Sequence, residues 1–233
     1  FDECTPYPCD EKYATRSMHM THRWLDRCIA RHKETEGLYG YDQILAPIIQ
    51  GSTYPHLRKI SAEYIASRDM PINAIGGLSV GEPHADMYEM TAVVTEILPK
   101  EKPRYLMGVG TPSNLLECIA LGIDMFDCVL PSRLARHGVV WVKAPKKQGI
   151  KLNGLGYNYE QVNLSNSEHK NDFGPIDKKC SCYTCKSGFS RSYIKHLISE
   201  QEPLGIHLTT IHNLAFTFDL VIDIKAKIKQ DKF

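Results

Sequence analysis

Four short apolar segments alternate with amphipathic helices along the first part of the chain, and this alternation limits the fold more than any other feature. The apolar segments are residues 44–50, 73–75, 104–107 and 125–130. Each ends close to a glycine or a polar residue. Strands that alternate with helices in this way predict an α/β fold with a parallel sheet, which is either open or part of a (β/α)8 barrel.

The helices predicted between these segments are recognised by apolar residues at a period near that of the α-helix. They span residues 11–32, 57–67, 83–99 and 115–121. The side chains that the first helix is expected to bury are Met18, Trp24, Leu25 and Ile29. Ser113 is predicted to cap the last helix, because a serine at the N-cap accepts a hydrogen bond from a free backbone N–H.

Three of the eight cysteines crowd into one short segment, whereas the others are scattered. Three thiolates and one imidazole suit a closed, tetrahedral zinc site that stabilises a fold and leaves no position for water. The predicted zinc ligands are Cys180, Cys182, Cys185 and His212. His196 and His207 are alternative fourth ligands, and three unrelated free cysteines are the alternative to a metal site.

The pattern changes after about residue 137. A strand is predicted at residues 139–142, surface hairpins and loops at 143–179, and helices at 190–199 and 209–227. A complete (β/α)8 barrel typically needs about 250 residues. We therefore expect residues 1–137 to be the C-terminal part of an incomplete (β/α)8 barrel, with a zinc-binding module and closing helices at residues 138–233, unless the sheet is simply open.

The overall composition points to a cytoplasmic protein. The 28 basic and 27 acidic residues nearly balance, so a nucleic-acid site has to be a local patch. No apolar run reaches the roughly 18 residues of a membrane span, and no membrane association is expected. Cysteines in a mid-sized chain without a secretory signal are typical of a reducing compartment.

The candidate chemical residues follow the predicted strands, where the active sites of α/β proteins gather. They are Asp2, Gln50, Gly76, Gly77, Leu78, Met107, Gly108 and Asp127. Carboxylates, an amide and exposed backbone N–H groups can read the edge of a planar, purine-like base, and a methionine can cover its ring. The pattern alone leaves other roles open: Gly76-Gly77 as a tight turn, Gln50 as a loop residue, and Asp124 in place of Asp127.

Several segments resemble bacterial tRNA-guanine transglycosylases, in the order found in that family. They are Phe-Asp-Glu-Cys-Thr-Pro-Tyr-Pro (1–8), Ile-Gln-Gly-Ser (49–52), Gly-Gly-Leu-Ser-Val-Gly-Glu (76–82), Tyr-Leu-Met-Gly-Val-Gly (105–110) and Met-Phe-Asp-Cys-Val-Leu-Pro-Ser-Arg (125–133). The cysteine cluster and residues 190–197 resemble the zinc module of the family. The resemblance implies exchange of guanine at the wobble position of tRNA for 7-aminomethyl-7-deazaguanine (preQ1), in queuosine biosynthesis.

The resemblance also implies a role for each matching residue. Asp127 is the nucleophile that attacks C1′ of the ribose and forms a covalent intermediate. The implied base-binding residues are Asp2, Cys4, Gln50, Gly76, Gly77, Leu78 and Met107. Val80 replaces the glycine of queuine-using eukaryotic enzymes, and its branched side chain favours the small aminomethyl base.

Two further segments match those that grip the anticodon, which implies a partner tRNA with a GUN anticodon. Their residues are Gly108, Val109, Gly110, Thr111, Pro112, Ser113, Asn114, Ser132, Arg133, Leu134, Ala135 and Arg136. Arg133 and Arg136 can bind phosphates or base edges with two hydrogen bonds each. The family resemblance further suggests a homodimer.

Three departures qualify the resemblance. The family carries a second essential aspartate in a Ser-Asp-Ser-Gly-Gly-type segment, and this sequence contains none. We therefore expect the chain to be the C-terminal portion of an enzyme and to have no exchange activity alone. His137-Gly138 replaces the usual Asn-Gly, and residues 143–176 match poorly. A non-catalytic tRNA-binding partner subunit of the same family is the alternative function, and a zinc-stabilised interaction module without a base pocket is a third.

Overall fold

The computed structural model describes residues 1–144 and 158–233, and they form two compact units. Unit one comprises Phe1–Val109 and Glu117–Cys128, and unit two comprises Gly110–Leu116 and Val129–Phe233. Part of the predicted loop region 143–179 lies outside the described residues. The division at residue 137 remains a prediction.

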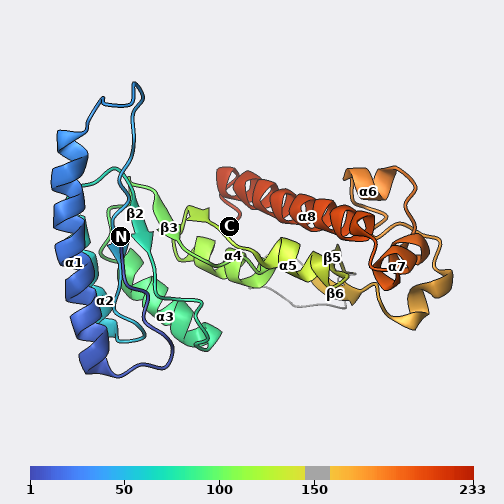
Figure 1. Cartoon of the computed structure of the whole chain (residues 1–233), viewed down its shortest axis with the longest axis horizontal. Helices are drawn as coiled ribbons and strands as arrows, with labels where there is room; N and C mark the ends of the chain where they lie inside the picture. Colours follow the sequence, from blue (N-terminus) through green and yellow to red (C-terminus); the bar gives the residue numbers. More distant parts are fainter. Residues whose placement is uncertain (145–157) are drawn as a thin grey trace. The chain divides into compact units, whose positions relative to one another are not determined.

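Unit one is built on a parallel sheet of four strands, which confirms the predicted α/β class (Figure 1). The strands are β1 (Ile48–Ile49), β2 (Asn73–Ile75), β3 (Arg104–Leu106) and β4 (Met125–Phe126), and they lie in sequence order. Their register pairs Ile49 with Ile75, Ile75 with Leu106 and Leu106 with Phe126, so the four C-terminal ends are aligned. Among the described residues this sheet has two open edges and does not close into a barrel.

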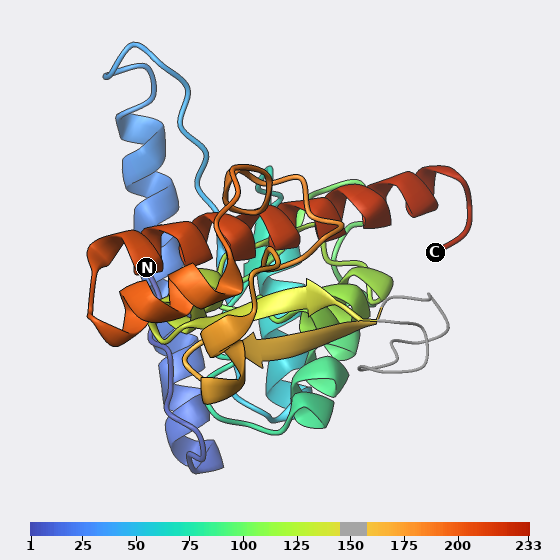
Figure 2. The same ribbon diagram turned by 90° about the vertical axis from the view of Figure 1, so that its right-hand side faces the viewer.

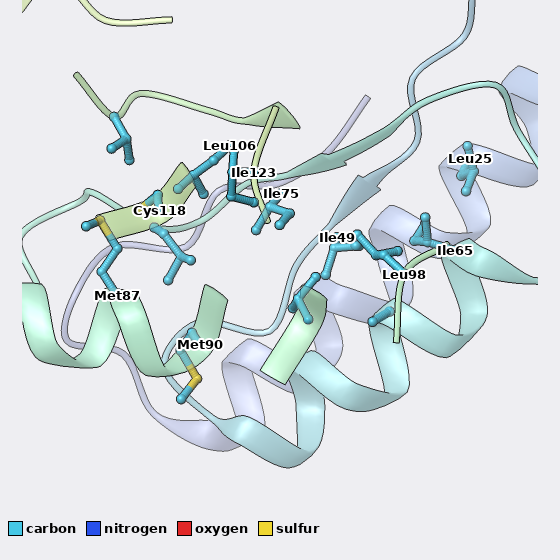
Figure 3. Packing of buried hydrophobic residues seen from close by; sticks show 14 residues of the cluster. Leu25, Ile49, Ile65, Ile75, Met87, Met90, Leu98, Leu106, Cys118 and Ile123 are labelled. Carbon is cyan, nitrogen blue, oxygen red and sulfur yellow. The ribbon is translucent and has the colours of Figure 1, made fainter. Parts of the chain in front are cut away.

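The helices of unit one form an apolar core with the sheet. They are α1 (Glu11–Glu34), α2 (Pro55–Ala66) and α3 (His84–Thr95), together with the end of α4 (Pro112–Ala120). Figure 3 shows Ile49, Ile75 and Leu106 of the strands packed with Ile65 of α2 and Met90 of α3. Burying one such side chain contributes about 1.5 to 3 kcal/mol to folding. The core therefore fixes the ends of the strands on which the candidate residues stand.

Two details of the helices differ from the prediction. Met18 and Leu25 of α1 are buried as expected, but Trp24 and Ile29 are only half-buried. The rest of the buried face of α1 consists of smaller or polar side chains, namely Ala14, Ser17, Thr21 and His22.

The N-cap of α4 lies two residues before the predicted one. The Oγ1 atom of Thr111 accepts a hydrogen bond from the N–H of Asn114 (3.2 Å), so Thr111, and not Ser113, occupies the N-cap. Pro112 takes the first helical position, where a missing N–H costs nothing.

Unit two joins an antiparallel pair of strands to several helices. It contains α5 (Leu130–Arg136), β5 (Val139–Lys143), β6 (Tyr159–Asn163), the 3₁₀ helix η1 (Ser167–Asn171), α6 (Tyr183–Lys186), α7 (Arg191–Ser199) and α8 (Pro203–Lys229). The long helix α8 packs against α5, α6, α7 and β5 (Figures 1 and 2). None of the helices in the described ranges is both long and apolar enough to cross a bilayer.

Two boundaries in this region were wrong. The strand predicted at residues 125–130 ends at Phe126, and Leu130 already begins α5. The last helix begins at Pro203 instead of about Thr209, again with proline in the first turn.

Candidate functional site

Asp127 directly follows β4 and its side chain is exposed. Its Oδ1 atom accepts two hydrogen bonds, from the Tyr105 hydroxyl of β3 (2.6 Å) and from the Gly108 N–H (3.0 Å). The hydrogen bond to Asp127 raises the pKa of Tyr105 to about 12, so the hydroxyl keeps its proton. The carboxylate is thus oriented through one oxygen, and within the described residues Oδ2 accepts no hydrogen bond.

Asp124 lies at the opposite end of the same strand. Its Oδ2 atom accepts a hydrogen bond from the backbone N–H of Arg104 (2.9 Å), and its own N–H donates to the Arg104 carbonyl (2.9 Å). Asp124 therefore fixes the start of β4 beside β3, whereas Asp127 stands at the end where candidate groups gather.

Gln50 and Asp2 form a polar pair at the ends of β1 and the N-terminal segment. The Nε2 atom of Gln50 donates to Oδ2 of Asp2 at 2.6 Å. The backbone N–H of Gln50 donates to the Ser61 hydroxyl (3.1 Å), which is in contact with Nε2 of His22 (3.0 Å). The amide oxygen of Gln50 is buried and has no partner among the described residues, so the pair offers acceptors for a ligand's N–H groups.

The Gly76-Gly77 turn follows β2 and lies against this pair. Gly77 has a φ of +64°, and a Cβ atom there would lie 2.2 Å from Oε1 of Gln50. At Gly76 a Cβ atom would lie 2.8 Å from Nε2 of Gln50. Only glycine allows the backbone to approach the pair this closely. The side chain of Leu78 packs into the core, so only its backbone is available to the site.

Several neighbouring residues complete this edge of the sheet. Burial and the Asp2 carboxylate raise the pKa of the Cys4 thiol, while the Gly77 backbone and Arg58 oppose them. Glu82 accepts hydrogen bonds from the N–H groups of Ser79 and Val80, and the Val80 side chain is exposed. Met107 is half-buried after β3.

The residues predicted to bind tRNA are divided between the units. Gly108 and Val109 belong to unit one, and the others belong to unit two. Arg133 and Arg136 of α5 are exposed, whereas Ala135 is buried and its carbonyl accepts a hydrogen bond from Thr209 (3.1 Å). The structure therefore does not assemble these residues into one described surface.

The cysteine cluster of unit two is a candidate metal centre. The ligand atoms of Cys180, Cys182, Cys185 and His212 all lie within 4.8 Å of one another. Nδ1 of His212 is 3.4 Å from the Cys185 sulfur and 3.7 Å from the Cys182 sulfur. Tetrahedral zinc with its usual bond lengths separates sulfur and nitrogen by about 3.6 Å, so the four atoms fit such an ion.

A further contact orients the histidine. The Nε2 atom of His212 is 2.8 Å from the Trp141 carbonyl, and the Nδ1 atom is directed at the sulfurs. Metal-bound histidines typically make such a hydrogen bond with the second ring nitrogen. The alternative histidines, His196 and His207, are exposed and lie outside the cluster.

Sequence reasoning missed two residues of the strand-end region. Tyr105 begins the segment 105–110, and the family resemblance implied no role for it. Arg58 is completely buried and donates to backbone carbonyls of the ends of β1 and β2. A signal for Arg58 was present, because it shares a helical face with Ala62 and Ile65, where an unpaired cation is unexpected.

Comparisons with known proteins show the family of the chain. A sequence model of the family described as queuine tRNA-ribosyltransferase matches residues 1–233. Curated proteins named queuine tRNA-ribosyltransferase are 47% identical in Staphylococcus haemolyticus, 46% in Desulforamulus reducens and 44% in Bacillus velezensis. These alignments cover 100% of this chain and 56%, 57% and 55% of the relatives, respectively. The chain thus spans about half the length of the curated relatives it matches.

Proposed function

Because this chain belongs to the queuine tRNA-ribosyltransferase family, we propose that it carries the base-exchange site of a tRNA-guanine transglycosylase. In this proposal the enzyme replaces guanine at the wobble position of tRNA with preQ1, in queuosine biosynthesis. The observation that supports it most is the Asp127 carboxylate, which is exposed, held through Oδ1 and open at Oδ2.

The proposed chemistry consists of two displacements at one carbon. Oδ2 of Asp127 attacks C1′ of the wobble ribose, the bond from C1′ to N9 of guanine breaks, and guanine leaves with that electron pair and takes up a proton. N9 of the incoming base, after losing its proton, attacks C1′ and releases the Asp127 carboxylate. Two inversions retain the configuration at C1′, as in retaining glycoside hydrolysis. Tyr105 and Gly108 keep the carboxylate oriented.

The base is read by groups at the ends of β1 and β2. We infer that the Asp2 carboxylate and the Gln50 amide oxygen accept hydrogen bonds from adjacent N–H groups of guanine. The N–H groups of Gly77 and Leu78 donate to its carbonyl oxygen, and Met107 covers the ring. The unpartnered, buried amide oxygen of Gln50 supports this assignment, because such an atom ordinarily has a partner.

Val80 sets the size of the incoming base in this proposal. Its side chain is exposed beside the glycine turn, and its N–H is tied to Oε2 of Glu82 (2.9 Å). A branched side chain leaves room for an aminomethyl group but crowds a cyclopentenediol. We infer that preQ1 is the substrate and that Val80→Gly admits the larger base.

Further assignments complete the proposal. We infer one structural zinc ion at the four cysteine and histidine ligands, which would tie α8 to the cysteine segment. The sequential parallel strands support a (β/α)8 barrel as the complete architecture. Exposed Arg133 and Arg136 support contact with the anticodon of a GUN tRNA. We further infer a cytoplasmic homodimer.

A chimera tests the function, with this chain replacing the matching residues of the Staphylococcus haemolyticus relative. We expect it to incorporate radiolabelled guanine into tRNA with a GUN anticodon, and the same tRNA with adenine at the wobble position to take up none. Failure to label the first tRNA by a folded chimera would contradict the proposal and favour a non-catalytic partner subunit. The oriented Asp127 argues against that alternative.

A further inference from the structure

One buried guanidinium lies beneath both loops of the proposed base site. Arg58 is 0% exposed. Its Nε atom donates to the Ser52 carbonyl (2.7 Å) and its Nη1 atom to the carbonyls of Ile49 (3.3 Å) and Gly76 (2.7 Å). Its Nη2 atom donates to the Gly77 carbonyl (2.9 Å). A single side chain therefore joins the end of β1 to the turn after β2.

The bonds to the glycine turn fix the direction of two N–H groups. In a trans peptide the C=O and the following N–H point in opposite directions. Because the Gly76 carbonyl faces Arg58, the Gly77 N–H faces the other way, toward the Cys4 thiol. In the same manner the Gly77 carbonyl turns the Leu78 N–H away from Arg58. Within the described ranges the Leu78 N–H meets no acceptor.

The chemistry of arginine explains why this residue type is needed. Its planar fork has five donors, which reach several carbonyls at once, whereas a lysine presents three donors from a single atom. In the described part of the chain no carboxylate forms an ion pair with Arg58. Its charge acts on Glu82 and Cys4 without direct pairing and on the peptides to which it donates. A polarised C=O makes the N–H of the same peptide a stronger donor.

We propose that Arg58 is the positioning residue of the base site: it fixes and polarises the N–H groups of Gly77 and Leu78 as a donor pair for the carbonyl oxygen of a planar base. The identity of the ligand rests on the proposed function. The orientation of the two peptides does not, and it is measurable without any ligand.

The test compares Arg58→Lys with a matched control, Arg104→Lys, in the 233-residue chain. Arg104 is also buried, and it donates to the carbonyls of Leu98 and Gly122. Chains labelled with ¹⁵N-glycine and ¹⁵N-leucine are examined by ¹H–¹⁵N NMR, and guanine binding is measured by calorimetry. We expect Arg58→Lys to shift the Gly77 and Leu78 signals and to weaken guanine binding about tenfold. Arg104→Lys should lower stability but leave both readouts unchanged.

Each outcome decides one question. Unchanged Gly77 and Leu78 signals in Arg58→Lys, or equal effects of the two variants, would overturn the proposal. If the unmodified chain does not bind guanine, the proposed base site is wrong, and the amide signals alone decide the role of Arg58. If Arg58→Lys does not fold, guanine is titrated into the unmodified chain. It should then move the Gly77 and Leu78 amide protons downfield more than other labelled amides, and smaller movements there would refute the donor pair.

Discussion

The strand-end site of unit one and the cysteine cluster of unit two hold polar groups in opposite ways. Asp127 is exposed and is oriented by two hydrogen bonds, from Tyr105 of β3 and from the loop that follows β3. It is not part of the apolar core of unit one. Cys180 and Cys185 are themselves part of the apolar cluster of unit two, together with Val140, Ile194 and Leu208. The comparison suggests that the exposed Asp127 is available for chemistry, whereas the buried cysteines determine the stability of unit two.

The largest effect is expected from removing the zinc ion that we propose for unit two. We expect a chelator, or Cys185→Ser, to unfold unit two while α1 to α3 keep their structure. Binding energies of structural zinc are on the order of 10 kcal/mol, more than a small unit can replace. Hydrogen exchange measured residue by residue checks this prediction. The control is Cys28→Ser in unit one, which should leave both units folded. If the amides of α8 stay protected from exchange without metal, the cysteine cluster does not determine the stability of unit two.

A smaller loss is expected from Gly77→Ala in unit one. The new Cβ atom would lie 2.2 Å from Oε1 of Gln50 at a φ of +64°, so the turn has to move. Strain and overpacking together cost about 2 to 5 kcal/mol. Gly108→Ala is the matched control, because Gly108 has a φ of +75° but nothing within 4 Å. It should cost only about 1 kcal/mol in urea unfolding, and equal costs would show that the contact with Gln50 is unimportant.

His22 gives unit one a predicted dependence on pH. Burial lowers its pKa to about 4 from an ordinary value of 6.5. The unfolded chain therefore takes up the proton first, and the stability of unit one should fall as the pH drops from about 6.5 to 4. The difference across that range is on the order of 3 kcal/mol. Unfolding free energies at several pH values check this, with His22→Gln as the variant that should lose the slope.

The smallest predicted change in stability comes from Tyr105→Phe. This variant removes one hydrogen bond from Oδ1 of Asp127 and leaves the one from Gly108. The free energy of unfolding should fall by less than about 1 kcal/mol. The rate of base exchange by the chimera should nevertheless fall about tenfold, because the carboxylate is less well oriented. An unchanged rate would show that Gly108 alone positions Asp127.

The elements of the fold could largely be predicted because their signals are local. β2 was predicted at its observed bounds, and α7 was predicted one residue early, at its own N-cap Ser190. One error occurred where two residues compete for one role. Thr111 and Ser113 are both good caps, and only Pro112 at the first helical position favours Thr111.

The site could be predicted less completely than the fold. Asp127 and the candidate base-binding residues lie at or beside the aligned ends of the four strands, and the predicted metal ligands lie in the cysteine cluster. Most of the predicted tRNA-binding residues lie in unit two, with Arg133 and Arg136 on α5. The supporting contacts could not be predicted, because they join distant segments: Arg58 to Gly77, Tyr105 to Asp127, and His212 to Trp141. Such contacts depend on how the elements pack, and no local pattern encodes them.

The central claim is that Asp127 forms a covalent bond to the wobble ribose. The most direct measurement incubates the chimera with an anticodon stem–loop RNA and detects an adduct that survives denaturation. We predict an adduct with the unmodified chain and with Asp124→Asn, which keeps an oxygen for the Arg104 N–H, and none with Asp127→Asn. An adduct in Asp127→Asn, or its loss only in Asp124→Asn, would contradict the account.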